Sequence, residues 1–274
     1  MVDVVVLGSG TPNPDPDRAG SALAIVGSDG WVLVDCGRGA TQRALAAGLD
    51  LHELVAVFLT HHHSDHLSDL STLAIARWAA GCGEPLRVVA PSGPCIAFAE
   101  HCLDPFDDEC FRLQSAPAAG PRPQIEVVAF DASDELQSVV DHDGWYVSTI
   151  LVQHHPVEPA VGYRIERDRV AIAVSGDTAV CDGVRRLAVD VDVLVHEALL
   201  SSRVSGRLLE WNASARSVGE LAAATGPRTL VLTHLIPAPM SNADEAAYLD
   251  EVRDGGFAGV TLVARDLLRI PVDG

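Results

Sequence analysis

The chain has 274 residues, of which 48% are hydrophobic and 21% charged, and its formal net charge is −19. A chain of this length can bury roughly three quarters of its unfolded surface, which is ample for a core. All nineteen basic residues are arginines, with no run longer than Arg185-Arg186. This balance disfavours a phosphate-backbone partner, which needs clustered positive charge.

No apolar stretch reaches the roughly 18 residues of a membrane-spanning helix, and Asp3 stands where a signal peptide would carry positive charge. We therefore expect a cytoplasmic enzyme with a single domain over residues 1–274. The six cysteines lack zinc-ribbon or redox spacing, so we expect free buried thiols. They are Cys36, Cys82, Cys95, Cys102, Cys110 and Cys181.

Apolar runs and turn signals alternate along the chain and predict strands interleaved with helices. Strands are predicted over residues 2–7, 22–26, 31–35, 55–60, 86–90, 125–130, 145–152, 170–174, 191–195, 229–233 and 260–263. Helices are predicted over residues 41–47, 65–80, 94–103, 214–224 and 244–254. The proline-rich segment 116–123 and the acidic segment 131–135 are predicted loops.

Four potential metal ligands lie within six residues, directly after the apolar run 54–59. Side chains two residues apart in an extended segment point to the same side, so His61 and His63 can converge on one ion. The predicted helix begins next, and Asp65 and His66 on its first turn can hold a second ion. Imidazole and carboxylate ligands favour zinc, although Mn²⁺ and Fe²⁺ accept the same set.

A dinuclear centre still needs two further imidazoles and a carboxylate that can bridge the ions. His154, Asp177 and His234 are candidates, because each follows an apolar, strand-like run. Ligands at strand ends gather along one edge of a sheet, where rigid elements hold them in place. The sequence therefore predicts one site built from distant segments.

With segments 7–12 (LGSGTP), 34–37 (VDCG) and 232–234 (LTH), this pattern resembles the metallo-β-lactamase superfamily, in its ribonuclease Z and arylsulfatase-like branch. The resemblance implies an α/β fold, an αββα sandwich of two packed mixed β-sheets flanked by helices, with two Zn²⁺ at one edge. It implies that the protein is a homodimer and that Asp35 orients the site. The implied ligands are His61, His63 and His154 for one zinc, Asp65, His66 and His234 for the other, and Asp177 as the bridge.

Three further histidines have different predicted roles. His62 should point away from His61 and His63, as a surface or packing residue. His155 competes with His154 for the third imidazole, and the resemblance favours His154. His196 also ends a strand-like run, and a catalytic role or a hydrogen-bonded place in the wall fits it equally well.

The chain departs from the ribonuclease Z pattern in three places. Asn212 stands 22 residues before His234, where that family has its proton-donating histidine. Asparagine donates a hydrogen bond but cannot transfer a proton. Segment 235–239 lacks the family's phosphate-contacting arginine, and the 22 residues between His154 and Asp177 are too few for a tRNA-binding arm.

We therefore predict a dinuclear zinc hydrolase whose metal-bridging hydroxide cleaves a small phosphodiester, ester, lactone or sulfate ester. Asp65 would also orient or deprotonate the attacking water, and His196 or Asn212 would face the leaving group. Trp211 adjoins Asn212, and its indole ring is a candidate to line the pocket of an apolar or aromatic substrate. We expect a small molecule as the partner, rather than a nucleic acid or a membrane.

Three alternatives remain open. The first is a ribonuclease Z-type endonuclease that processes tRNA 3′ ends. The second is a non-catalytic, metal-bound binding protein, which a vacant acid position at Asn212 would suit. The third is a flavin-linked di-iron oxygen reductase, but that family has a glutamate where His63 stands and an attached flavin domain.

Overall fold

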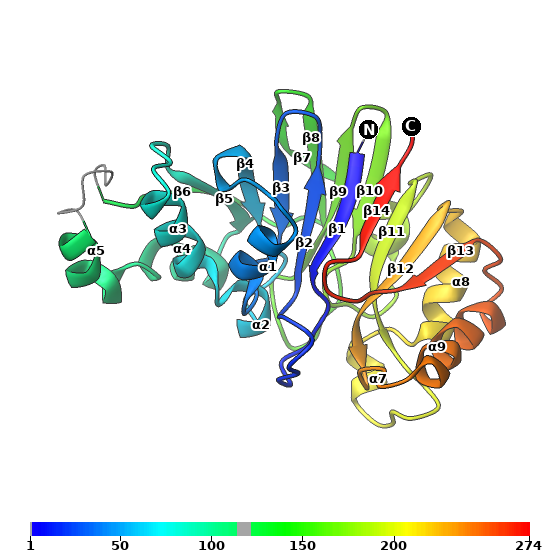
Figure 1. Ribbon diagram of the computed structural model, residues 1–274. Coiled ribbons are helices and arrows are strands. Elements are labelled where there is room, and N and C mark those ends of the chain that lie inside the picture. The colour runs from blue at the N-terminus through cyan, green and yellow to red at the C-terminus, as the bar shows by residue number, and fades with distance from the viewer. Residues whose placement is uncertain (1, 114–121) are drawn as a thin grey trace.

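The computed structural model describes residues 2–113 and 122–274, which form two β-sheets packed face to face between layers of helices (Figure 1). In spatial order, the first sheet contains β14 (Arg269–Val272), β1 (Val2–Gly8), β2 (Ala22–Val26), β3 (Trp31–Val34), β4 (Leu54–Phe58), β5 (Leu86–Pro91) and β6 (Ile125–Phe130). The second contains β13 (Val260–Val263), β12 (Thr229–Ile236), β11 (Val193–Leu199), β10 (Val170–Val174), β9 (Val161–Arg167), β8 (Trp145–Leu151) and β7 (Gln137–His142).

Helices cover the outer face of each sheet, which completes the predicted αββα sandwich (Figure 1). The helices are α1 (Ala40–Ala46), α2 (Ser64–Leu67), α3 (Leu70–Ala79), α4 (Pro94–His101), α5 (Asp107–Leu113), α6 (Asp182–Leu187), α7 (Leu208–Trp211), α8 (Ala215–Thr225) and α9 (Asn242–Asp254). Two short 3₁₀ helices, η1 (Leu51–Glu53) and η2 (Asp104–Phe106), join them. The predicted fold class is confirmed.

Three apolar clusters hold these layers together. One lies between the sheets, one between the first sheet and helices α1, α3 and α4, and one between the second sheet and helices α6, α8 and α9. Strand β11 shows how alternation divides its residues between two clusters. Val193 and Val195 face the other sheet, whereas Leu194 and Ala198 face the helices.

The helix predicted over residues 65–80 is wrong at one point, because it is broken into α2 and α3 at Ser68 and Asp69. The backbone N–H of Asp69 donates to the carbonyl of Cys36, and its side chain accepts from the N–H of Thr41 at 2.7 Å. These tertiary contacts replace the helical hydrogen bonds. They also tie the ligand-bearing turn to the end of β3.

Several elements differ from the predicted ones. Strands β7, β9 and β14 and helices α5, α6 and α7 were not predicted, and α5 projects from the body (Figure 1). Strands β11 and β12 continue past their predicted ends at residues 195 and 233. The predicted loop at 131–135 lies between β6 and β7. Residues 116–121 of the other predicted loop lie outside the described residues.

Among the described helices, none combines the length and apolar character needed to cross a bilayer. All six cysteines are free, and only Cys82 is not buried. Burial raises the pKa of the Cys95 thiol to about 12 and that of Cys102 to about 11. These thiols therefore behave as core side chains.

Candidate metal centre

The predicted ligands come together at one edge of the sandwich, where loops leave the strands of both sheets. Helix α2, which carries Asp65 and His66, lies at the edge opposite the two termini (Figure 1). All seven side chains are buried except His63, which is partly buried. The arrangement follows from the way each strand ends.

His61 and His63 lie in the extended segment between β4 and α2. Alternation in this segment turns both rings to the same side, and their centroids are 4.6 Å apart. His62 lies between them and is partly exposed. The hydroxyl of Thr60 lies 3.0 Å from Nδ1 of His61, which leaves Nε2 of that ring free for a cation.

Asp35 fixes the other histidine of this motif. Its Oδ2 lies 2.7 Å from Nδ1 of His66, and its Oδ1 accepts from the backbone N–H of Thr60 at 2.8 Å. Position 37, two residues after Asp35, requires glycine, because a Cβ there would lie 1.9 Å from the carbonyl oxygen of Asp65. Segment 34–37 therefore positions a ligating imidazole through its far nitrogen, as metal sites commonly require.

His154 and Asp177 enter from two loops of the second sheet. His154 follows β8, and Asp177 follows β10 after Gly176. Gly176 has φ +62°, and a Cβ there would lie 3.0 Å from Cβ of Thr60. Glycine thus allows the chain to turn against the first sheet and to present Asp177 between the two halves of the site.

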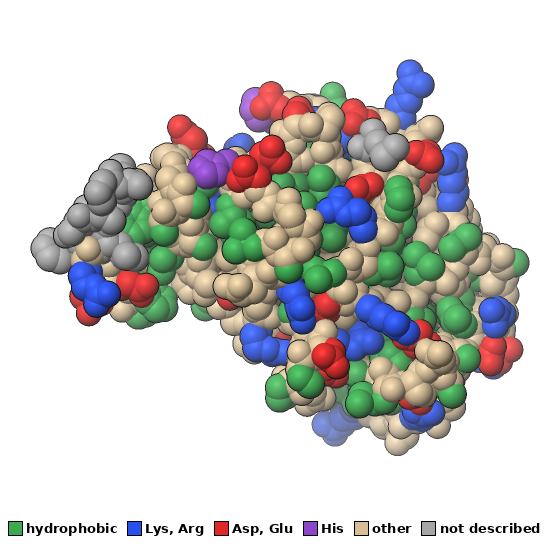
Figure 2. All heavy atoms as spheres, in the orientation of Figure 1, with side chains coloured by type: hydrophobic (Ala, Val, Ile, Leu, Met, Phe, Trp, Pro, Cys, Tyr) green, Lys and Arg blue, Asp and Glu red, His purple; other side chains and the backbone are tan. Residues whose placement is uncertain are grey.

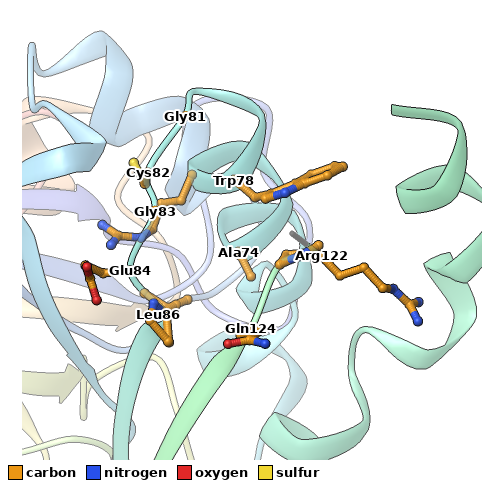
Figure 3. A pocket seen from close by; sticks show the side chains of 12 residues that line it. Ala74, Trp78, Gly81, Cys82, Gly83, Glu84, Leu86, Arg122 and Gln124 are labelled. Carbon is orange, nitrogen blue, oxygen red and sulfur yellow. The ribbon is translucent and has the colours of Figure 1, made fainter. Parts of the chain in front are cut away.

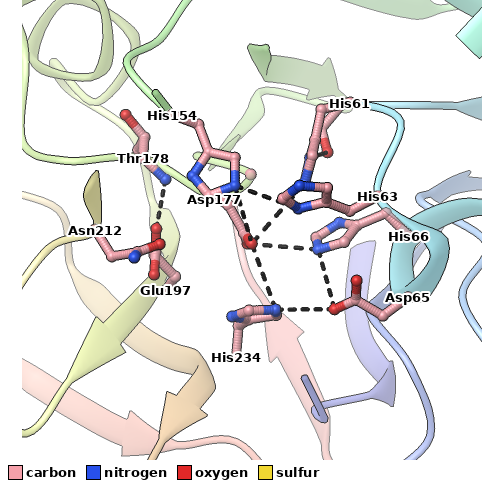
Figure 4. Close-up of polar contacts among 12 residues, drawn as sticks. His61, His63, Asp65, His66, His154, Asp177, Thr178, Glu197, Asn212 and His234 are labelled. Atoms are coloured by element: carbon pink, nitrogen blue, oxygen red, sulfur yellow. Dashed lines mark hydrogen bonds and ion pairs between the residues drawn. The ribbon is translucent and has the colours of Figure 1, made fainter. Parts of the chain in front are cut away.

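His234 occupies a β-bulge near the end of β12. Glu197 of β11 pairs with Thr233 and Ala198 pairs with Leu235, so His234 is an extra residue in the ladder. Its φ is 47°, in the left-handed region. A bulge of this kind redirects one side chain. Here the redirected imidazole points at the carboxylates of Asp65 and Asp177 (Figure 4).

The ligand atoms form two groups, and Asp177 of the first group also approaches the second, since its Oδ1 lies 3.5 Å from Nε2 of His66 and its Oδ2 lies 3.4 Å from Nε2 of His234 (Figure 4). In the first group, Nε2 of His154 lies 3.4 Å from Nδ1 of His63 and 3.9 Å from Oδ2 of Asp177. In the second, Nε2 of His234 lies 3.1 Å from Oδ2 of Asp65. The first contains His61, His63, His154 and Asp177, and the second contains Asp65, His66 and His234.

The residues fit a pair of divalent cations. Nε2 of His61 and Nε2 of His66 are buried without a hydrogen-bond partner among the described residues. Buried polar atoms are costly when they have no partner, and bound cations would remove this cost. Each group offers nitrogen and oxygen donors close enough to share one ion, and the mixture favours zinc.

Burial and neighbouring charges set the protonation of the site. Burial lowers the pKa of His61, His63 and His154, which favours the neutral imidazole that binds metal. Burial would also lower the pKa of His66, but the carboxylates of Asp177 and Asp35 raise it well above its ordinary value. Burial would raise the pKa of Asp177, yet His234 and His66 hold it well below its ordinary range.

Other candidate residues lie around the centre rather than in it. His155 is exposed, so the structure places His154 and not His155 among the ligands. His196 shares the helix-covered face of β11 with Leu194 and Ala198, and its Nδ1 lies 2.8 Å from the carbonyl oxygen of Glu197. The structure therefore does not bring His196 together with the candidate ligands. Its position does not support a proton-donating role.

Asn212 lies next to the centre, at the end of α7, and is 8% exposed. Its side-chain Nδ2 donates to the carbonyl oxygen of Leu208 at 3.1 Å. The neighbouring Trp211 is partly buried. Glu197 was missed by sequence reasoning, although its carboxylate lies within 4.8 Å of ligand atoms of Asp177 and His234.

Several hollows in the described part of the chain contain no candidate ligand, and two of them are relevant here. A cavity of about 120 Å³ beyond the end of α3 is lined by Trp78, Cys82 and Arg122 among others, and by no metal ligand (Figure 3). A wider hollow of about 1090 Å³ borders Gln153 and Cys181, beside the loops of His154 and Asp177. Its rim is acidic, with Asp131, Asp134, Glu135, Glu158 and Asp182.

The sandwich and its shared-carboxylate donor set define a metal-dependent hydrolase. Residues 30–235 match the model of the beta-lactamase superfamily domain. The chain is 33% identical over 283 residues to ribonuclease Z of Mycobacterium bovis (strain BCG / Pasteur 1173P2), covering 99% of each protein. It is 32% identical to ribonuclease Z of Mycolicibacterium paratuberculosis, over 100% of this chain and 99% of the relative.

Solved structures share the fold at lower identity. The metallo-beta-lactamase fold protein YhfI from Bacillus subtilis has a TM-score of 0.73 at 19% identity, covering 99% of this chain and 100% of that one. The short form of human tRNase Z has a TM-score of 0.72 at 20% identity, covering 99% of both chains. The chain therefore belongs to the metallo-β-lactamase superfamily, in its ribonuclease Z branch.

The predicted partner, a small molecule rather than a nucleic acid, is wrong, because relatives that match over nearly the whole chain are ribonucleases. The net charge was misleading because local charge governs binding at a cleft. Acidic and basic side chains are interspersed on the surface seen in Figure 2. Arg18, Arg38 and Arg43 also gather from separate segments, since the latter two donate to backbone carbonyls at residues 18 and 17.

Within this arginine group, the backbone of Arg38 lies beside that of Asp65. The backbone N–H of Arg38 and the carbonyl of Asp65 both approach the same face of Gly20, each 2.7 Å from where a Cβ would be. Arg43 is paired with Asp266 at 3.0 Å, whereas Arg38 has no carboxylate partner in the described part of the chain. The acidic protein thus keeps an exposed arginine whose backbone lies beside that of Asp65 and whose guanidinium donates to the carbonyl of Arg18.

Proposed function

We propose that the protein is a ribonuclease Z-type endonuclease that cleaves precursor tRNA at its 3′ end with the help of two divalent cations, most suitably zinc. The observation that carries this proposal is the pair of candidate ligand groups that Asp177 connects, in a chain that matches ribonuclease Z over 99% of its length. A bound metal pair supplies an activated water and neutralises charge on the phosphoryl oxygens.

Three side chains have separate proposed roles in the cleavage reaction. Asp65 holds one carboxylate oxygen toward His234, and its other oxygen, Oδ1, has no described partner and can accept a proton from the attacking water. Asn212 uses one N–H of its Nδ2 to donate to the carbonyl of Leu208; its second N–H can donate to the leaving oxygen, but the amide cannot supply a proton. The exposed Arg38, which has no carboxylate partner among the described residues, is the candidate to bind a neighbouring phosphate.

The test is a cleavage assay on protein whose metal content has been measured. The substrates are a precursor tRNA with a 3′ trailer and the same tRNA without its trailer. We expect a single cut at the 3′ end of the precursor, lost on chelation and restored by Zn²⁺ or Mn²⁺. The proposal is wrong if protein with both metals bound leaves the precursor intact.

A further inference from the structure

Glu197 is a buried carboxylate behind the metal centre and belongs to neither ligand group that the resemblance implies. It is 1% exposed and lies on the inner face of β11, two residues beyond Val195. Burying a carboxylate away from water costs free energy unless its oxygens have hydrogen-bond or ionic partners. The identity of those partners therefore indicates what the residue does.

One oxygen of Glu197 holds the loop of the bridging ligand. Oε1 accepts a hydrogen bond from the backbone N–H of Thr178, the residue directly after Asp177 (Figure 4). Both a charged and a neutral carboxyl group can accept this bond, and the charged form accepts it more strongly. Asp177 is thus held between Gly176, which turns the chain, and a backbone N–H that is fixed from β11.

Thr178 extends the connection to a second ligand loop. Its Oγ1 accepts from the backbone N–H of Gln153 at 3.0 Å, and Gln153 directly precedes His154. The carbonyl oxygen of Gln153 in turn accepts from the N–H of Ala179 at 2.9 Å. Glu197, Thr178 and Gln153 therefore form a continuous chain of hydrogen bonds behind two ligands from different loops.

The other oxygen of Glu197 faces the space between the sheets. Oε2 has no hydrogen-bond partner among the described residues. A cavity of about 20 Å³ is lined by Glu197, Asp177 and His234, among others. A cavity this size has room for one water, which would satisfy Oε2 and link it to the bridging carboxylate.

We infer that Glu197 is a positioning residue of the metal centre, which fixes the loops of Asp177 and His154 through Thr178 and Gln153. The inference rests on the metal centre of the proposed function but not on its RNA substrate. Residues behind metal ligands typically change metal affinity by about 10- to 100-fold. Metal affinity, rather than RNA cleavage, is therefore the primary measurement.

The experiment compares Glu197→Ala, Glu197→Gln and Thr178→Val in the full-length protein. Alanine removes the acceptor for the Thr178 N–H, whereas glutamine keeps a carbonyl acceptor of the same length. Valine at position 178 keeps the backbone N–H but removes the link to Gln153. Val193→Ala is the matched control, because it leaves a cavity on the same face of β11 without touching a polar group.

Zinc affinity is measured by competition with a chromogenic chelator, and geometry by the absorption spectrum of the Co²⁺-substituted protein. We expect Glu197→Ala and Thr178→Val to weaken zinc binding by about 10- to 100-fold and to change the Co²⁺ spectrum. Glu197→Gln should retain both properties. Val193→Ala should lower the melting temperature and leave both properties unchanged.

Unchanged affinity and spectrum in Glu197→Ala, or in Thr178→Val should the alanine variant not fold, would overturn the inference. It would also be overturned if Glu197→Gln kept both metals and the spectrum but lost turnover, because Glu197 would then act on the substrate. Failure of the wild-type protein to cut precursor tRNA would count against the proposed function alone.

Discussion

Two residues of the metal centre adopt left-handed backbone conformations that side chains other than glycine rarely occupy. Asp35 has φ 60° and His234 has φ 47°. Such conformations cost about 1–3 kcal/mol each and persist only where surrounding contacts enforce them. The Thr60 N–H and His66 hold Asp35, and the bulge in β12 holds His234.

Removing one ligand should empty one half of the centre. His63→Ala leaves His61 and His154 as the only imidazoles in the first group, so we expect metal analysis to find one ion fewer per chain. Turnover should fall by more than about 100-fold, since even residues behind ligands contribute this much. Full turnover with half the metal would contradict a dinuclear mechanism, and circular dichroism checks that the variant is folded.

A proton donor introduced at position 212 should raise the cleavage rate. Asn212→His places an imidazole at the end of α7, and general acid catalysis typically contributes about 10²- to 10⁴-fold. We expect the largest gain in the cleavage rate of precursor tRNA, whose leaving oxygen needs a proton, and little gain with an aryl phosphodiester. Equal rates for the variant and the wild type on both substrates would show that position 212 is not the vacant acid position.

Local order was enough to group four of the candidate ligands: alternation for His61 and His63, and a helical turn for Asp65 and His66. The other three candidates were selected because each follows a strand-like run. Glu197 could not be found in this way. The run of apolar residues ends at Val195, so the sequence does not show that β11 continues to Leu199. Only that continuation places Glu197 on the inner face and His196 on the outer face.

At the scale of elements, the predicted strands and helices agree with the structure where the apolar periodicity is strong. Strands that form mainly because they pair with a neighbouring strand were not predicted. In β9, the charged residues Arg164 and Glu166 alternate with Tyr163 and Ile165, which are fully buried. β14 contains Pro271, which is tolerated because the strand lies at the edge of its sheet. Neither pairing is visible from one strand alone.

Two matched helix caps offer a test of how α8 supports the site. Ser214 accepts from the N–H of Ser217 at the start of α8, and Ser241 accepts from the N–H of Asp244 at the start of α9. Replacing either serine by alanine should lower the free energy of unfolding by about 1 kcal/mol, measured by urea denaturation.

Only Ser214→Ala should also reduce turnover, because Ser214 follows Asn212 by two residues and its segment pairs with Leu199 of β11. Ser241→Ala is the control for the loss of a similar helix cap that is not adjacent to Asn212. Equal turnover in the two variants would show that α8 does not position Asn212.

At the scale of the whole molecule, the metal centre joins two halves of the sandwich. His61, His63, Asp65 and His66 follow a strand of the first sheet, and the other ligands belong to the second sheet. Any ion bound there connects residues more than 90 positions apart, such as His63 and His154. Bound metal should therefore stabilise the contact between the sheets.

Chelation should lower the melting temperature measured by differential scanning calorimetry. A site saturated 1000-fold above its dissociation constant adds about 4 kcal/mol of stability, which corresponds to a shift on the order of 10 °C for a chain of this size. His63→Ala should show a smaller shift on chelation. An unchanged melting temperature in wild-type protein would mean that the ligands do not hold the sheets together.

Strand β14 follows every strand of the second sheet in the chain, yet it pairs with β1 of the first sheet, from Val2 opposite Val272 to Val5 opposite Arg269. During synthesis on the ribosome, this edge of β1 stays unpaired until the whole second sheet has emerged. An open apolar edge attracts other strands. The nascent chain is thus most exposed to aggregation late in translation, when a chaperone that covers β1 would matter most.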